Sequence, residues 1–150
     1  MSVLSGSSRG EIDAPIERCW ALVEDVEAAP RWQRGLERMD VLERDEEGRA
    51  SVCETLNDVK LVKALVTVRF SYEPPHRLSW TLVRSEDLRS LDGSWELEAL
   101  GPGRTKATYS LALDPGPVGA LARGPMVRMI RPLVVGRRPE ELASALSRPA

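Results

Sequence analysis

The sequence predicts an α+β fold in which a curved antiparallel β-sheet wraps around a long C-terminal α-helix. Three observations predict it: one helical segment from Pro15 to Asp25, strand-like sequence from about Leu36 to Asp114, and a basic, proline-punctuated, helix-like tail. A long sheet with a helix near each end forms a cup, and such a cup can hold an apolar ligand. The 150 residues fit a single domain spanning positions 1–150.

Composition excludes several classes of protein. A net charge of -2 gives no reason to expect a DNA-binding protein. No apolar run approaches the ~18 residues of a membrane-spanning helix, and Met1 to Gly10 lacks the apolar block of a secretory signal. We therefore expect a cytoplasmic protein. Cys19 and Cys53 match neither metal-ligand nor redox spacing, which predicts buried or half-buried free thiols.

The first elements are a strand and a short helical pair. Residues 3–12 form a weakly patterned edge strand, and Asp13 or Ala14 then caps a helix with Pro15 at its first position. Spacing of i, i+3, i+4 and i+7 gives this helix one apolar stripe, made of Ile16, Cys19, Trp20 and Val23. A second short helical turn follows, ending near Trp32.

The middle of the chain alternates in the way that strands do. Apolar side chains occupy even positions from Val62 to Tyr72 and from Leu78 to Leu82, and odd positions from Trp95 to Ala99 and from Ala107 to Leu113. One buried face and one solvent-exposed face are typical of an antiparallel sheet.

The tail carries prolines every seven residues, at Pro125, Pro132 and Pro139. Because an internal proline removes a backbone hydrogen bond and kinks a helix, we expect a bent or segmented helix. The expected segments run from Pro125 to about Val135 and from Pro139 to Leu146, with Gly136 as the joint. Whether the helix is continuous or split there stays open.

An ordered series of motifs runs along nearly the whole chain. The series is Ile12-x-Ala14-Pro15-x-Glu17-x-x-Trp20, Asp25-Val26-Glu27-x-x-Pro30-x-Trp32, Tyr72-Glu73-Pro74-Pro75, Leu78-x-Trp80, Leu91-x-Gly93-x-Trp95, and Gly103-x-Thr105 leading to Tyr109. These motifs resemble the START-like (SRPBCC, Bet v 1-like) superfamily and its polyketide cyclase and lipid-transport group. The spacing is most similar to the coenzyme Q-binding and ribosome-association-toxin-like branch.

The resemblance implies a helix-grip fold with a cavity between the sheet and the C-terminal helix. Combined with the alternation, it predicts an apolar lining of Val66, Val68, Phe70, Trp80, Leu82, Trp95, Leu97, Tyr109, Met126, Met129, Ile130 and Leu133. The alternative is that these side chains fill a closed core, because ligand pockets and cores have similar composition.

Polar residues that alternate in step with the buried apolar side chains are the stronger candidates for contact with a ligand. Glu54 lies between two apolar even positions, Arg84 continues the face of Trp80, and Tyr109 carries a hydroxyl. The alternative for Glu54 and Arg84 is that they reach water at a strand end or beside a bulge. His76 is the single histidine and follows two prolines in a turn, so neither a histidine triad nor a zinc site is expected, and no cofactor is predicted.

We expect the protein to bind or transfer a hydrophobic small molecule such as a lipid, an isoprenoid quinone or a polyketide-like compound. One alternative is an enzyme, a polyketide cyclase or aromatase, in which Arg84, Tyr109 or Glu54 assists proton transfer. A further alternative is weak contact with a membrane surface or a ribosome through the basic tail. That tail carries Arg123, Arg128, Arg131, Arg137, Arg138 and Arg148.

Overall fold

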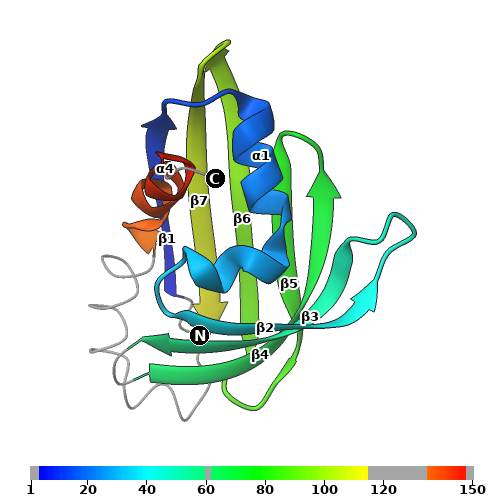
Figure 1. Ribbon diagram of the computed structural model, residues 1–150. Helices are drawn as coiled ribbons and strands as arrows, with labels where there is room; N and C mark the ends of the chain where they lie inside the picture. The colour runs from blue at the N-terminus through cyan, green and yellow to red at the C-terminus, as the bar shows by residue number, and fades with distance from the viewer. Residues whose placement is uncertain (1–3, 60–61, 115–134, 148–150) are drawn as a thin grey trace.

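The chain folds into a seven-stranded antiparallel sheet with helices on its concave face and beside one edge (Figure 1). The computed structural model describes residues 4–59, 62–114 and 135–147. The elements are β1 (Leu4–Ile12), α1 (Ile16–Glu24), η1 (Val26–Arg31), β2 (Leu36–Arg44), β3 (Ala50–Val59), β4 (Val62–Glu73), β5 (Arg77–Ser85), β6 (Ser90–Gly101), β7 (Arg104–Asp114) and α4 (Arg138–Ser147). This is the predicted helix-grip arrangement.

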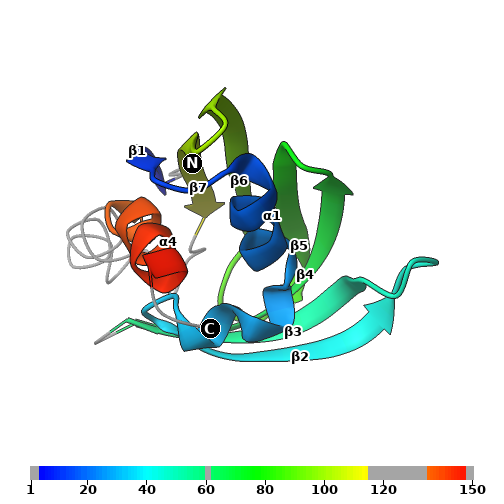
Figure 2. The same ribbon diagram turned by 45° about the horizontal axis from the view of Figure 1, so that its top comes forward.

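The strands follow the order β1-β7-β6-β5-β4-β3-β2, and all neighbours are antiparallel. Strands β2 to β7 are therefore a succession of hairpins, whereas β1 joins the far edge, pairing Leu4 with Leu113 and Ile12 with Thr105. The sheet curls strongly, and α1 and η1 lie across its concave face (Figure 2). Helix α4 lies beside β1 and contacts β7 and α1. Among the described helices, none is long and apolar enough to cross a membrane.

Helix α1 buries the predicted apolar stripe against the sheet. Ile16, Cys19, Trp20 and Val23 are its buried residues, and the two cysteines of the chain are both buried and free. The start of the helix differs by one residue from the prediction. Pro15 is the N-cap, with an extended ψ of 154°, rather than the first helical residue.

A buried hydroxyl fixes the junction between β1 and α1. The Thr105 side chain of β7 donates a hydrogen bond to the carbonyl oxygen of Ala14 at 2.8 Å, and both residues are buried. This carbonyl belongs to the connection that turns the chain from the sheet edge onto the concave face. The bond therefore sets where α1 begins to cross the sheet.

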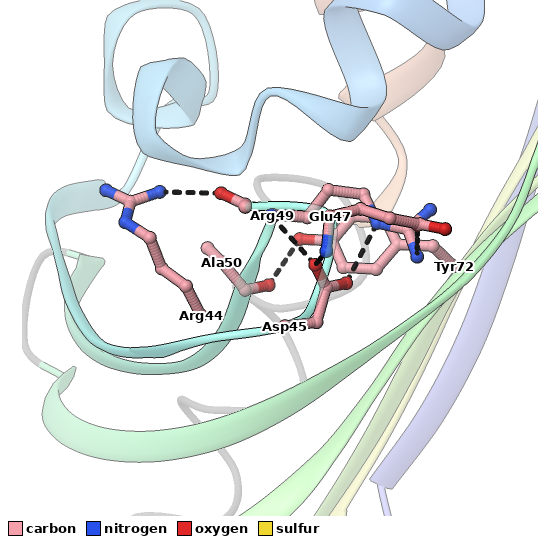
Figure 3. Close-up of polar contacts among 7 residues, drawn as sticks. Arg44, Asp45, Glu47, Arg49, Ala50 and Tyr72 are labelled. Atoms are coloured by element: carbon pink, nitrogen blue, oxygen red, sulfur yellow. Dashed lines mark hydrogen bonds and ion pairs between the residues drawn. The ribbon is translucent and has the colours of Figure 1, made fainter.

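The hairpin between β2 and β3 is held by a polar cluster (Figure 3). The Asp45 carboxylate accepts hydrogen bonds at 2.9 Å from the backbone N–H groups of Glu47 and Arg49 and from Arg49 Nε. The Arg49 guanidinium lies 4.6 Å from the centre of the Tyr72 ring, and the Tyr72 hydroxyl donates to the Ala50 carbonyl at 2.5 Å. Asp45 thus has a structural role in this turn, and the cluster joins the hairpin to β4.

One of the two helical segments expected in the tail is confirmed. Helix α4 covers Arg138–Ser147, one residue longer at each end than predicted, and a turn at Gly136 and Arg137 precedes it. The expected segment from Pro125 lies outside the described residues, apart from Val135.

Candidate functional site

An apolar cavity of about 140 Å³ lies between the concave face of the sheet, α1, η1 and the start of α4. The helices contribute Val23, Val26 and Ala29, and the sheet contributes most of the remaining wall. Inward-facing residues of neighbouring strands line it because paired residues share a face, as Val66 of β4 does with Thr55 of β3. The cavity is therefore a direct product of the curvature and the strand register.

Four aromatic rings form one continuous side of the cavity. Ring centres are 6.0 Å apart for Phe70 and Trp80, 5.7 Å for Trp80 and Tyr109, and 5.0 Å for Tyr109 and Trp95. All four residues line the cavity. Such a surface suits a planar apolar molecule, since ring pairs at these separations attract one another.

The structure brings together much of the apolar lining expected from the alternation. Val66, Val68, Phe70, Trp80, Trp95 and Tyr109 all line the cavity. Leu97 is buried in the core and Leu82 packs partly buried against it, but neither is among the lining residues. Met126, Met129, Ile130 and Leu133 lie outside the described residues.

Glu54 does not face the cavity. It pairs with Thr67 on the outer face of the sheet, its side chain is 34% exposed, and Oε1 lies 3.7 Å from Arg38 Nη2. The expected parity of β3 is wrong because this strand carries apolar residues on both faces. Its odd positions, including Thr55 and Asn57, are the ones that line the cavity.

Arg84 also lies on the outer face. A β-bulge between β4 and β5 places Val68 opposite Leu82 but Thr67 opposite Arg84, so Val83 is the extra residue. One inserted residue reverses every later side chain in the strand. Arg84 is consequently exposed, although simple alternation from Trp80 predicts it inside.

The cavity has a buried cation that the alternation did not identify. Arg138, at the start of α4, is 3% exposed and lines the cavity. Its Nη1 donates to the Arg34 carbonyl at 2.8 Å and to Glu141 Oε1 at 2.7 Å, while Glu141 Oε2 accepts from the Arg34 N–H at 2.9 Å. The guanidinium carbon lies 5.5 Å from the centre of the Tyr109 ring. The Arg138–Glu141 spacing of i, i+3 was the available sequence signal, and the surrounding basic tail obscured it.

Other polar groups of the lining are neutral. Thr55 donates to the Val66 carbonyl at 3.1 Å, Asn57 Nδ2 donates to Thr55 Oγ1 at 3.1 Å, and Gln33 follows η1. His76 is exposed in the turn between β4 and β5, away from this lining. Within the described part of the chain, no group of three His, Cys, Asp or Glu side chains is arranged to hold a metal ion.

Burial of Arg138 also changes the expected basic surface of the tail. With both of its described hydrogen bonds directed to Arg34 and Glu141, this arginine is not available to a membrane or a ribosome. Arg137 is exposed, and Arg123, Arg128, Arg131 and Arg148 lie outside the described residues. Contact through the tail therefore stays a prediction.

Comparison with solved structures shows the same fold in several bacterial proteins. A START superfamily protein from Mycobacterium smegmatis matches with a TM-score of 0.72 and 18% identity, over 95% of this chain and 96% of that chain. The Zhui aromatase/cyclase from Streptomyces sp. R1128 matches with a TM-score of 0.81 and 16% identity, over 98% of this chain and 95% of that chain. No curated protein matches the chain in sequence.

A family model covers most of the sequence. The model described as polyketide cyclase / dehydrase and lipid transport matches residues 5–143, from β1 to within α4. The motifs that resemble the START-like superfamily lie within this range, whereas the coenzyme Q-binding branch stays a prediction. The chain therefore belongs to the polyketide cyclase/dehydrase and lipid-transport family.

Proposed function

We propose that the protein binds or transfers a hydrophobic small molecule in the cavity between the sheet and its helices. The observation that carries the proposal is the cavity itself: it is lined mainly by apolar side chains and has a continuous aromatic side. Each Å² of apolar ligand surface removed from water contributes about 25 cal/mol to binding. A ligand that fills such a cavity is held mainly by burial and by contact with the rings.

Cavity size limits what fits without rearrangement. An apolar cavity of roughly 150 Å³ accepts a molecule the size of benzene, and the present cavity measures about 140 Å³. A single substituted ring, or one segment of a larger ligand, matches this volume. A whole lipid, a long isoprenoid quinone or a multi-ring polyketide exceeds this volume and would extend beyond it.

Native mass spectrometry of gently purified protein tests the proposal. We expect a co-purifying apolar compound, and binding of a lipophilic fluorescent dye by protein from which that compound has been extracted. Val66→Phe fills the cavity and is expected to abolish both signals. Leu65→Phe is the matched control, because Leu65 precedes it on β4 and is 41% exposed on the outer face.

The outcome that overturns the proposal is specific. If folded, extracted protein binds no lipophilic dye, or if Val66→Phe binds as well as Leu65→Phe, the cavity is only a packing defect of the core. Thermal unfolding of both variants checks that each remains folded.

A cyclase or aromatase is the second candidate. The proximity of Tyr109 and Arg138 at the cavity wall favours it, because a hydroxyl and a cation beside an aromatic side can orient a carbonyl-bearing chain and assist proton transfer. Glu54 and Arg84 play no part in this version, because both lie on the outer face. Tyr109→Phe should then change the products formed from a reactive poly-β-ketone without loss of dye binding. Unchanged products would remove the enzymatic alternative.

A further inference from the structure

The guanidinium of Arg138 has a buried donor without a hydrogen-bond partner among the described residues. Of its N–H groups, Nη1 is used by the Arg34 carbonyl and Glu141. Nε is buried and has no hydrogen-bond partner among the residues that the structure describes. A buried donor without an acceptor carries a free-energy penalty, so a partner that supplies an oxygen is favoured.

The side chain that carries this donor forms part of the cavity wall. Arg138 belongs to the wall, and its guanidinium stands beside the Tyr109 ring, another part of that wall. The other polar lining residues lie on different elements: Thr55 and Asn57 on β3, and Gln33 after η1. Arg138 is the one formal charge among the residues that line the described cavity.

Charge balance indicates what kind of oxygen the donor takes. Arg138 already has a carboxylate partner in Glu141, whose side chain is 16% exposed, so the pair is neutral as a unit. An incoming carboxylate would add an uncompensated negative charge to an apolar cavity, which is costly. A neutral carbonyl or phenol oxygen accepts one hydrogen bond and leaves the Arg138–Glu141 pair intact.

We infer that Arg138 is the polar anchor of the cavity and that the ligand is a neutral, oxygen-bearing aromatic compound whose carbonyl or phenol oxygen accepts a hydrogen bond from Nε. The inference rests on the proposed function and names the chemical class of its ligand. The oxygen lies at the start of α4, beside Tyr109, and the apolar part of the ligand extends along the rings of Trp80 and Phe70.

Three probes of one ring each test this assignment: acetophenone, α-methylstyrene and benzoate. Acetophenone and α-methylstyrene have nearly the same shape, but only the first has an oxygen acceptor; benzoate carries a charge. The primary readout is the Nε–H signal of Arg138 in nitrogen–proton correlation spectra of the wild-type protein, assigned by its loss in Arg138→Lys. We expect acetophenone to move this proton signal downfield and α-methylstyrene to leave it nearly unchanged.

Affinities in a mutant cycle give a second readout. Lysine keeps the charge that pairs with Glu141 but lacks Nε, so Arg138→Lys should weaken acetophenone about tenfold and change α-methylstyrene by less than about twofold. Arg137→Lys, an exposed neighbour, is the control and should change neither. Benzoate should bind more weakly than acetophenone to the wild-type protein.

The outcomes separate the two proposals. If α-methylstyrene and acetophenone both bind but Nε–H responds equally to each, the cavity binds apolar molecules and the anchor is wrong. If benzoate binds tightest, the neutral-oxygen assignment is wrong. If none of the three probes binds to folded protein and the lipophilic dye does not bind either, both the proposed function and the assignment of Arg138 as the anchor are wrong. Because the first readout uses wild-type protein, instability of Arg138→Lys leaves the test intact.

Discussion

The indole ring of Trp80 lies against the backbone of Gly93 on the neighbouring strand, so close that a Cβ at position 93 would stand 2.2 Å from Trp80 Cε2. Trp80 and Gly93 are directly paired in the β5–β6 register. Only glycine leaves room for the ring there, and this placement presents Trp80 to the cavity.

Gly93→Ala is therefore expected to displace Trp80 and to reshape the cavity. Overpacking of this kind typically lowers the free energy of unfolding by about 1–3 kcal/mol. Chemical denaturation gives the stability, and dye binding gives the change in the cavity. Gly101→Ala is the control on the same strand, since no atom lies within 4 Å of its added Cβ. Equal stability of the two variants would contradict the steric role of Gly93.

Tyr72→Phe tests the cluster that joins the β2–β3 hairpin to β4. The change removes the hydrogen bond to the buried Ala50 carbonyl but keeps the ring beneath the Arg49 guanidinium. We expect the free energy of unfolding to fall by about 1–2 kcal/mol, because the carbonyl loses its side-chain partner. Urea denaturation measures the loss. A variant as stable as wild type would show that the hydroxyl contributes nothing.

Thr105→Val tests the junction between β1 and α1. Valine keeps the shape of the side chain but cannot donate to the Ala14 carbonyl. Because both residues are buried, we expect a loss of about 1–3 kcal/mol in stability. Thr108→Val makes the same chemical change on the outer face of β7 and should have an effect below about 0.5 kcal/mol. Matching losses in the two variants would argue against the Ala14 contact.

The buried thiol of Cys53 is expected to make the folded protein less stable at high pH. Burial raises the pKa of its thiol to about 11, above the ordinary value of 9.0. Between these values the unfolded chain has released the proton while the folded chain retains it, so stability is present at lower pH and falls as pH rises. Cys53→Ala should show a shallower fall from pH 9 to pH 11, by roughly 2 kcal/mol in total. Parallel pH profiles for the two proteins would rule this contribution out.

Much of the fold could be predicted because local periodicity decides it. The stripe of α1 and the alternation along β4 both give the correct buried face, since Cys19, Val66 and Val68 are all inside. The alternation of β6 and β7 likewise places Trp95 and Tyr109 in the core. In each of these elements only one face is apolar, so the register has one favourable solution.

The wrong predictions of side-chain orientation arise where the sequence pattern is compatible with either face of the sheet. Strand β3 has apolar side chains on both faces, so its alternation could not show that Thr55 rather than Glu54 faces inward. The segment from Leu82 to Arg84 fits the sheet equally well with or without an extra residue, and the bulge depends on the partner strand. Arg138 and Glu141, three residues apart on α4, both bond to the backbone of Arg34 from a distant segment, and a run of arginines cannot indicate that contact.

The strand order has a consequence for the kinetics of folding. Each pairing from β2 to β7 closes only the short connection of one hairpin, which is fast and entropically inexpensive. The pairing of β1 with β7 instead joins Ile12 to Thr105, and the contact of α4 with the loop after η1 joins Arg138 to Arg34. The meander can thus form without either end of the chain, and of the two slow, long-range closures the second brings Arg138 to the cavity wall. The polar part of the cavity wall is therefore completed only when the last helix has docked.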